Sequence, residues 1–437
     1  MDSRQIALEI FLAGVENVKP DKLIANSVSI SGKNLIVDNK GFDLTSIQNI
    51  YVIGAGKASA LMAKALESVL GPLIKGGHMV TKYGHSASLK YLEVTEAGHP
   101  VPDENGLLGT EQIITYAQKV EKNDLVICLL SGGGSSLLTD VPQGCKLAEL
   151  ASLNDLLLKS GADIGEINCV RKHLSAIKGG QLAKIAFPAC IVSLILSDVI
   201  GDPVDVIASG PTAYDTSTFS DVMSVLKRYN ITSKVAPSIL KILNEGIEGK
   251  RAETLKKEDL SANQIYNFII GNNSLALRAA KSKAENLDYY VQIETNSLCG
   301  DVDDVALRLI DTAVKSKNEN KGRKTCLLFG GEPTVKISGK GLGGRNQHLA
   351  LICAKLLQNQ ECITVLSGGT DGSDGPTDAA GAVVDFQTFD NAKKLNLDIN
   401  EYLSNCDSYH FFQQEGGLII TGPTQTNVMD LIIVLIG

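Results

Sequence analysis

The sequence has no tryptophan, no Cys-x-x-Cys pair and no long basic run, and no apolar stretch approaches about 20 residues. A nucleic-acid-binding face normally combines clustered basic and aromatic side chains, so with a net charge of −8 we expect no nucleic-acid partner. The missing apolar stretch argues against a membrane-spanning helix. The segment Met1–Val18 lacks the charged start and the cleavage site of a signal peptide. We therefore expect a cytoplasmic protein without membrane contact.

The nine cysteines are scattered and odd in number, which does not suit a disulfide framework or a zinc knuckle. We expect them to be reduced thiols, mostly in the core, as in other cytosolic proteins.

The length of 437 residues predicts two domains, at about 100–200 residues each. Short apolar runs alternate with helical patterns throughout, which predicts βαβ units and an α/β fold with two three-layer α/β/α domains and mostly parallel sheets. A polar, charged segment at Gly246–Gln264 suggests the boundary, giving a Rossmann-like domain at 1–255 and a second domain at 256–437, although a strand of one half could join the other. Expected strands are Ile50–Ile53, Gly77–Thr81, Tyr91–Thr95, Leu125–Leu129, Cys190–Leu196, Tyr266–Ile270, Val291–Glu294, Thr325–Phe329, Cys362–Leu366 and Leu431–Ile436.

Ligands of open α/β sheets bind beyond the carboxyl ends of the strands, so the loops that follow the apolar runs carry the functional hypotheses. The first is Gly54-Ala55-Gly56-Lys57-Ala58-Ser59. Gly54 and Gly56 would let the backbone approach an anion at a helix N-terminus. Ser59 replaces the third glycine of a dinucleotide fingerprint, and a plain strand-to-helix turn is an equal alternative. Lys57 favours a ligand site, because a cation here would face the crevice.

The second loop, Ser131-Gly132-Gly133-Gly134-Ser135-Ser136, resembles a nest of backbone N–H donors for phosphate. Its alternative is a flexible turn. Further on, Arg171, Ser175 and Lys178 have helical spacing and would share a face that clamps carboxylate or phosphate, if the helix continues to Lys178. The alternative is a solvated basic surface.

Acidic and basic side chains follow later strands. Asp198 could hold Mg²⁺ together with phosphate oxygens or activate a hydroxyl, and a turn or helix cap is an equal alternative. In the second half, Glu332 and Asp371 also follow strands in glycine-rich turns. Arg345 opens a helix and would suit charge stabilisation on a transferring phosphoryl group.

Several common motifs are absent. The sequence contains no P-loop, no protein-kinase signature, no Gly-x-Ser-x-Gly elbow and no His-Glu-x-x-His. If ATP binds, another type of loop holds it.

Together the loops resemble those of glycerate 2-kinases that carry a MOFRL C-terminal domain. The matches occur in the family's order across nearly the whole chain, which is more specific than any single loop. One departure lies near the C-terminus, where the resemblance leads us to expect glycine at Gln425 and asparagine at Met429. The matching stretches are GAGKAS (54–59), GHPVPDENG (98–106), LSGGGSSLL (130–138), NCVRKHLSAIKGGQLA (168–183), LSDVIGDPVDVIASGPT (196–212), GGEPTVKISGKGLGGRNQHLAL (330–351), SGGTDGSDGPTDAAGA (367–382) and TGPTQTNVMDL (421–431).

The resemblance implies two α/β domains, the second of the MOFRL type, with the active site in the cleft between them. It implies transfer of the γ-phosphoryl group of ATP to the 2-hydroxyl of D-glycerate, giving 2-phosphoglycerate and ADP, with Mg²⁺ or another divalent cation. In such families the positions that match Lys57 and Arg345 are implicated in substrate binding and catalysis.

On this hypothesis Lys57 and Arg345 close from opposite domains on the substrate carboxylate and the transferring phosphoryl group. Residues 132–136 would cradle nucleotide or glycerate oxygens, and Asp198, with Asp371 or Glu332 as alternatives, would hold the metal or orient the hydroxyl. Phosphoryl transfer needs mainly positioning and charge stabilisation, so these groups suffice without a covalent intermediate.

Two rival functions stay open. One is an NAD(P)H-dependent hydroxypyruvate reductase built on the 54–59 loop, against which Ser59 argues. The other is a non-enzymatic sensor of phosphorylated metabolites. The sequence does not fix the oligomeric state, and a homodimer stays open.

Overall fold

The computed structural model describes residues 2–259, 264–320, 322–358 and 360–437. Its chain forms two compact units. The N-terminal unit comprises Ile24–Leu196 and Asp202–Ile270, and the C-terminal unit comprises the chain up to Leu23, Ser197–Gly201 and Gly271–Gly437. The division thus falls near residue 270, whereas the sequence suggested 255, and the first helix folds with the second half of the chain.

The N-terminal unit is built on a six-stranded sheet in the order β6-β5-β4-β7-β8-β9. The pairings from β6 to β8 are parallel. The hydrogen bonds from Ile191 to Gln264 and from Ser197 to Gly271 advance in the same direction, so β9 is parallel as well. This sheet confirms the expected fold class. Its strands are β4 (Ile50–Ala55), β5 (Ile74–Lys82), β6 (Glu93–Ala97), β7 (Leu125–Leu130), β8 (Cys190–Leu196) and β9 (Ile265–Gly271).

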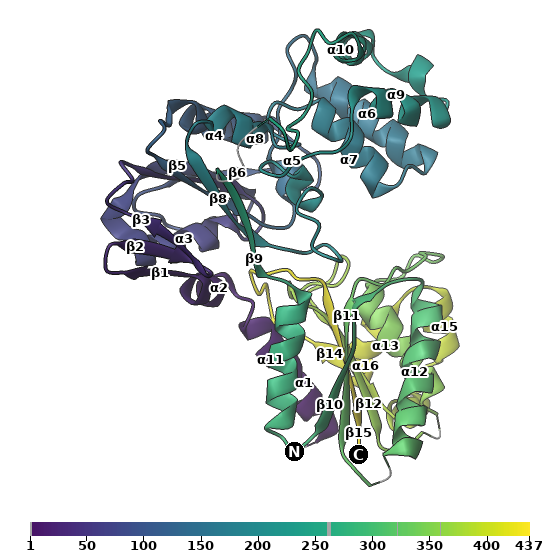
Figure 1. Cartoon of the computed structure of the whole chain (residues 1–437). Coiled ribbons are helices and arrows are strands. Elements are labelled where there is room, and N and C mark those ends of the chain that lie inside the picture. The colour runs from purple at the N-terminus through teal and green to yellow at the C-terminus, as the bar shows by residue number, and fades with distance from the viewer. Residues whose placement is uncertain (1, 260–263, 321, 359) are drawn as a thin grey trace. The chain divides into compact units, whose positions relative to one another are not determined.

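Helices cover both faces of this sheet. Figure 1 shows α4 and α8 on one side, and α3 with a small antiparallel sheet, β1-β2-β3, on the other. Each strand of the small sheet is only four residues long, which is why these strands were not expected. These elements are α2 (Pro20–Ser27), β1 (Val28–Ser31), β2 (Asn34–Val37), β3 (Lys40–Asp43), α3 (Ser59–Leu70), η1 (Gly71–Leu73), α4 (Glu104–Lys119), α5 (Gly134–Leu137) and α8 (Gln181–Ala186).

A group of helices in the same unit has its own apolar core. Apolar side chains of α6 and α7, among them Leu153, Leu157 and Val170, pack with Phe219, Val222 and Leu243 of α9 and α10. The group consists of α6 (Leu147–Ser160), α7 (Ile164–His173), α9 (Phe219–Arg228) and α10 (Pro237–Ile247), with the short turns η2 (Ile207–Ser209) and η3 (Thr232–Lys234) beside it.

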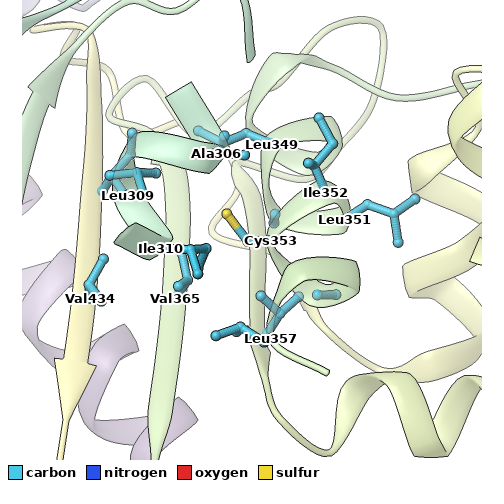
Figure 2. Close-up of a cluster of buried hydrophobic side chains, with 14 of the residues drawn as sticks. Ala306, Leu309, Ile310, Leu349, Leu351, Ile352, Cys353, Leu357, Val365 and Val434 are labelled. Atoms are coloured by element: carbon cyan, nitrogen blue, oxygen red, sulfur yellow. The ribbon is translucent and has the colours of Figure 1, made fainter. Parts of the chain in front are cut away.

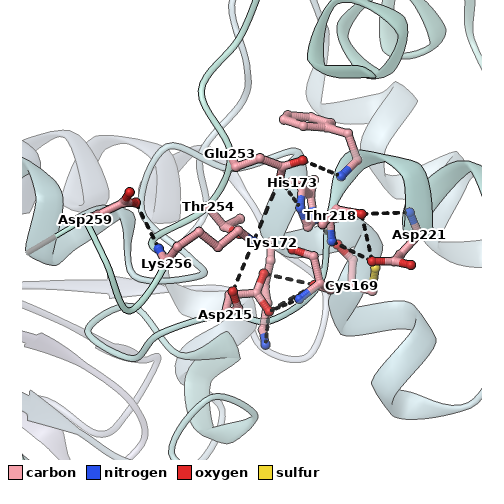
Figure 3. Close-up of polar contacts among 12 residues, drawn as sticks. Cys169, Lys172, His173, Asp215, Thr218, Asp221, Glu253, Thr254, Lys256 and Asp259 are labelled. Carbon is pink, nitrogen blue, oxygen red and sulfur yellow. Dashed lines mark hydrogen bonds and ion pairs between the residues drawn. The ribbon is translucent and has the colours of Figure 1, made fainter. Parts of the chain in front are cut away.

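The segment that the sequence suggested as a linker, Gly246–Gln264, is anchored to this unit as far as Asp259, and residues 260–263 lie outside the described part. Figure 3 shows its polar contacts. Glu253 accepts a hydrogen bond from the ring of His173 at 3.0 Å and another from the backbone N–H of Phe219. Leu255 is fully buried. Although its composition is polar, the segment up to Asp259 is therefore not a free linker and packs against α7.

The C-terminal unit contains the second six-stranded sheet, in the order β10-β11-β15-β12-β13-β14. Here the expectation of mostly parallel pairing does not hold, because only the β10·β11 pair is parallel among the described residues. The last strand of the chain, β15, inserts antiparallel between β11 and β12, which run in the same direction. The strands are β10 (Tyr290–Leu298), β11 (Thr325–Gly331), β12 (Ile363–Gly369), β13 (Gly381–Asp385), β14 (Leu418–Ile419) and β15 (Asp430–Ile436).

Helices cover both faces of this sheet too, with α1 and α11 on one side and α12 and α13 on the other (Figure 1). Figure 2 shows side chains of α12 and α13, including Leu309 and Cys353, packed against Val365 and Val434 of the sheet. The side chain of Arg4 on α1 binds Asp385 at 2.8 Å and Glu415 at 3.1 Å. The helices are α1 (Ser3–Glu16), α11 (Asn273–Glu285), α12 (Val302–Glu319), α13 (Arg345–Leu356), α14 (Thr388–Lys394), α15 (Ile399–Ser404) and α16 (Ser408–Glu415).

All nine cysteines are free thiols. Cys128, Cys169, Cys326 and Cys353 are buried, whereas Cys299 and Cys362 are exposed, so the expectation of core thiols holds for only part of the set. None of the described helices combines the length and the hydrophobicity needed to cross a membrane.

Candidate functional site

In the N-terminal unit, the two glycine-rich loops lie side by side because they follow the neighbouring parallel strands β4 and β7. The backbone N–H of Lys57 donates to the carbonyl of Gly132 at 2.9 Å, and that of Ser131 donates to Ala55 at 3.1 Å. The buried hydroxyl of Ser131 accepts from the N–H of Ala58 at 3.0 Å. Ser131 therefore joins the loops and supports the start of α3.

The glycines of the first loop are required by packing within the protein. A Cβ on Gly54 would lie 2.1 Å from the carbonyl oxygen of Leu129, and one on Gly56 would lie 2.1 Å from Oγ of Ser131. Ser59, which stands where a dinucleotide fingerprint has its third glycine, donates its buried hydroxyl to the carbonyl of Gly56 at 2.8 Å. The first loop thus packs closely against β7 and the residue that follows it, and Lys57 lies at its end.

The second loop presents backbone donors. Gly133 adopts a left-handed conformation with φ of 81°, and Gly134 starts the single turn of α5. Within the described part of the chain, the N–H groups of Gly132 and Gly133 have no hydrogen-bond partner. Consecutive free N–H groups form a concave anion site, which supports the predicted phosphate cradle.

Lys57 lies beside this cradle. Lys57 has no carboxylate ion-pair partner among the described residues, and its Cγ lies near Gly133, where the His99 ring also packs. Burial and the charges of Lys57, Lys82 and His85 lower the pKa of His99 to about 4. Sequence reasoning missed Lys82, His85 and His99, because each is isolated in the sequence and contacts between distant segments leave no local signal.

Ser135 and Ser136 face a cavity that also receives Arg171, Ser175 and Lys178. The expected continuous helix is wrong, because α7 ends at His173 and the hydroxyl of Ser175 accepts from the N–H groups of Ile177 and Lys178 in the following turn. The three predicted side chains nevertheless line one cavity. Ser135 itself shares a hydrogen bond with Ser209, at 2.7 Å between their hydroxyl oxygens.

In the C-terminal unit, Arg345 is the first residue of α13 and is held by two carboxylates. Its Nε and Nη2 donate to both oxygens of Asp430 at 2.6 and 2.9 Å, and its Nη1 lies 2.8 Å from Glu332. The side chain of Asp430 is fully buried, whereas that of Glu332 is 46% exposed. Asp430 lies 85 residues beyond Arg345, and no local motif indicates this pairing.

The side chains of Arg345 and Glu332 border a cavity of about 740 Å³ within the C-terminal unit, which also contacts Asp198, His348 and Asp374. The Asp374 carboxylate accepts from the N–H groups of Asn346 at 3.0 Å and Gln347 at 2.8 Å, at the start of α13. Burial raises the pKa of Asp374 to about 6, against the lowering effect of those two bonds. The structure thus brings Asp198, Glu332 and Arg345 together, and it adds Asp374 and His348.

The two predicted metal ligands differ in their surroundings. Asp198 borders the cavity and accepts from the amide of Asn427 at 3.3 Å. Asp371 does not border it, and its carboxylate accepts from the N–H and the hydroxyl of Ser373, as in an Asx turn. The described residues contain no group of three or more His, Cys, Asp or Glu side chains arranged for a metal ion. Mg²⁺ is often bound by only one or two protein carboxylates together with substrate phosphates. A single carboxylate such as that of Asp198 is therefore enough for an ion that arrives with a nucleotide.

Comparison with known proteins identifies the family. A family described as a domain of unknown function (DUF4147) matches residues 6–244, and the MOFRL family matches residues 325–430. A "Glycerate 2-kinase" from Pyrococcus horikoshii is 41% identical, covering 100% of this chain and 98% of the relative. The chain belongs to the glycerate kinase family. A crystal structure of glycerate kinase from Thermotoga maritima matches with a TM-score of 0.88 at 41% identity, covering 99% of each chain. Another relative of this family, from Agrobacterium vitis, is 36% identical over 100% of this chain and 95% of its own, and its name gives a hydroxypyruvate reductase activity only as an assumption.

The one departure from the glycerate kinase pattern has a structural signature. Gln425 and Met429, where the resemblance led us to expect glycine and asparagine, both have positive φ, at 64° and 70°. Glycine and asparagine tolerate this left-handed conformation best. The loop before β15 therefore keeps the backbone that its usual residues favour.

Proposed function

We propose that this chain transfers the γ-phosphoryl group of ATP to the 2-hydroxyl of D-glycerate, giving 2-phosphoglycerate and ADP. Membership of the glycerate kinase family supports the substrate class. The observation that carries the proposal is Lys57, a cation without an ion-pair partner in the described part of the chain, beside the free N–H groups of Gly132 and Gly133. Such a set binds phosphoryl oxygens without having to displace a carboxylate.

Each half of the chain has its own part in this proposal. Lys57 and the 132–136 loop bind phosphoryl oxygens, and Lys57 stabilises the charge that spreads over them during transfer. Arg345, fixed by Asp430, offers its remaining Nη1 edge, and the exposed carboxylate of Glu332 yields that edge to an incoming anion. Because Glu332 occupies that edge of Arg345 before an anion arrives, the action of Arg345 depends on substrate binding.

A double-substitution experiment tests whether both cations act on one phosphoryl transfer. Lys57→Ala and Arg345→Ala should each lower kcat/KM, and in the double variant the losses should fall short of the product of the single losses, as they do for residues that act as a unit. Unchanged kcat/KM in either single variant would remove that residue from the reaction.

Magnesium enters the proposal through Asp198. Such an ion would supply positive charge that offsets the charge of the nucleotide phosphates. Asp198 would hold it, or would instead orient the 2-hydroxyl of glycerate, with Glu332 and Asp371 as the alternatives for either role. Asp371 is the weaker candidate, because its carboxylate is engaged in the turn with Ser373.

The rival function is an NAD(P)H-dependent hydroxypyruvate reductase. The close packing of Gly54 and Gly56 against β7 and the buried hydroxyl of Ser59 give this loop a role that needs no dinucleotide. A pair of assays separates the two functions: release of ADP from ATP with D-glycerate, and loss of NADH absorbance with hydroxypyruvate. We expect turnover in the first assay only, and turnover in the second assay alone would replace the proposal with its rival.

A further inference from the structure

A cavity of about 330 Å³ lies within the N-terminal unit, between α6, α7 and the segment 135–140. Leucines of α6 form one wall of it, and their spacing places them on one helical face. The wall consists of Leu147, Leu150, Leu153, Leu157 and Leu158. Binding sites for organic cofactors are largely apolar with a few convergent polar groups, and the volume lies within their usual range of roughly 300–1,000 Å³.

The polar end of this cavity holds the cations Arg171 and Lys178. Arg171 donates from Nε and Nη2 to the side-chain oxygen of Asn154, a neutral partner, and no carboxylate pairs with it among the described residues. Nζ of Lys178 donates to the carbonyl of Leu138 and lies 3.6 Å from Asp140. Asp140 also accepts from Ser175 and Ala176, and the other carboxylate of the lining, Asp155, pairs with Lys159 at 2.7 Å, so neither of these two carboxylates pairs with Arg171.

Burial lowers the pKa of both Arg171 and Lys178, which is the direction expected of cations that lack enough counter-charge. Removing charge from water is costly unless the charge is paired. An anionic group of a ligand at this end would supply the missing partner.

The cavity adjoins the glycine-rich loop. Ser135 and Ser136 line it, and so do Pro100, Val101 and Pro102, which directly follow His99. His99 in turn packs against Gly133, beside Lys57. An anionic chain leaving the cavity over this loop would therefore meet the free N–H groups of Gly132 and Gly133.

We propose that this cavity holds the nucleoside part of ATP, with the base against the α6 leucines and the phosphates toward Arg171, Lys178 and the glycine-rich loop. The inference rests on the proposed kinase function, and it assigns the ATP of that reaction to the cavity beside α6. Every carbon of glycerate carries oxygen, so glycerate would leave the aliphatic wall unused. A purine presents broad faces of low polarity that suit this wall.

The absence of tryptophan allows a direct test. Leu158 is 57% exposed at the rim of the cavity, so Leu158→Trp places a single fluorescent reporter there. Magnesium ADP and adenosine should each change its emission saturably, and D-glycerate and inorganic phosphate should not. Leu73→Trp in η1 is the matched control, because Leu73 is 43% exposed and precedes β5 at the opposite end of the strand from the loops. Its emission should not respond to ADP.

A kinetic test uses the cations. Arg171→Gln should raise KM for ATP about 10- to 100-fold, as expected for a lost charge-assisted hydrogen bond, and should leave KM for D-glycerate unchanged. The control is Arg228→Gln, which removes an exposed arginine paired with Glu166 in the same unit and should change neither constant. If Arg171→Gln fails to fold, the reporter variant still decides.

Turnover of D-glycerate by the parent enzyme is measured first, so that failure of the kinase function is recognised separately. With turnover established, two results would overturn the inference. The first is that the emission of Leu158→Trp changes with D-glycerate, or fails to change with any of the ligands. The second is that Arg171→Gln raises the KM for D-glycerate and not the KM for ATP. Saturable responses to both ADP and adenosine together with the KM split would establish it.

Discussion

The two halves of the chain treat their candidate catalytic cations in opposite ways. In the N-terminal unit, Lys57 lies among Lys82, His85 and His99 and has no carboxylate ion-pair partner among the described residues. In the C-terminal unit, Arg345 is bound by Asp430 and Glu332. The first arrangement leaves positive charge for a ligand, whereas the second fixes the orientation of a guanidinium at some expense of free charge.

The same sequence pattern, a lone cation in a glycine-rich turn, therefore has two uses. In one unit the cation is free to attract an anionic ligand, and in the other it is held in a fixed orientation by carboxylates. Lysine is a flexible point charge, while arginine offers a planar fork that a carboxylate can hold in two bonds. Lys57 should therefore matter for catalysis and little for stability, and the Arg345–Asp430 pair should matter for both.

The largest effect is expected at Asp430. Asp430→Asn leaves Arg345 without its buried partner and should lower the free energy of unfolding by about 3–5 kcal/mol. Glu332→Gln removes the exposed partner of the same arginine and should cost no more than about 1 kcal/mol. Urea unfolding of both variants measures the difference, and equal losses would contradict the assigned roles of the two carboxylates.

The next largest effect concerns Lys57. Lys57→Met keeps the aliphatic stem that lies against Gly133 and removes the charge. It should lower kcat/KM by about 10²- to 10³-fold, as for other transition-state charge stabilisers. Its free energy of unfolding should stay within about 0.5 kcal/mol of the parent value. Lys75→Met, at the exposed start of β5, is the matched control and should alter neither quantity.

A pH effect should distinguish the cationic region. Because burial and neighbouring cations lower the pKa of His99 from 6.5 to about 4, the folded protein binds this proton less readily than the unfolded chain. The contribution of His99 to stability is therefore fully present above pH 6.5 and is lost as the pH falls toward 4.

In His99→Gln, the decrease in the free energy of unfolding between pH 7 and about 4 should be smaller than in the parent protein by roughly 1–3 kcal/mol. Urea unfolding of parent and variant between pH 7 and about 4 isolates the effect, since the other titrating groups are shared. Parallel pH profiles would show that the cations do not act on His99.

The smallest effect is expected in the loop before β15. Gln425 is exposed and has φ of 64°, so Gln425→Gly should relieve a left-handed strain of about 1–2 kcal/mol. Glycine gives back roughly 0.5–1 kcal/mol through the entropy of the unfolded chain, which leaves a net gain of about 1 kcal/mol or less. A raised thermal midpoint would support this, and a lowered one would show that the Gln425 side chain contributes contacts.

Much of the N-terminal fold was predictable, because strands buried on both faces are continuous apolar runs. The expected strands within β4, β7 and β8 all formed, and adjacency of β4 and β7 explains why their loops meet. The insertion of β15 between β11 and β12 was not predictable, since an apolar run reveals burial but neither direction nor neighbours. The same holds for α1, because nothing in its local sequence indicates that it packs in the C-terminal unit.

The candidate site was predictable where function follows a strand end. Lys57 and Ser135 were singled out in this way, and Arg345 as a cation at the start of a helix, whereas their neighbours His99 and Asp430 were missed because contacts distant in sequence leave no local signal. The helical spacing of Arg171, Ser175 and Lys178 gave a correct grouping for a wrong reason. The helix stops at His173, and a turn held by Ser175 brings Lys178 to the same cavity.

The identity of the reaction product tests the central claim most directly. D-glycerate and ATP are incubated with the enzyme, and the product is examined by phosphorus NMR against authentic 2- and 3-phosphoglycerate. The account predicts a single phosphomonoester signal at the position of 2-phosphoglycerate, formed in step with ADP and lost in Lys57→Met. A signal of 3-phosphoglycerate, or no phosphorylated glycerate at all, would contradict it.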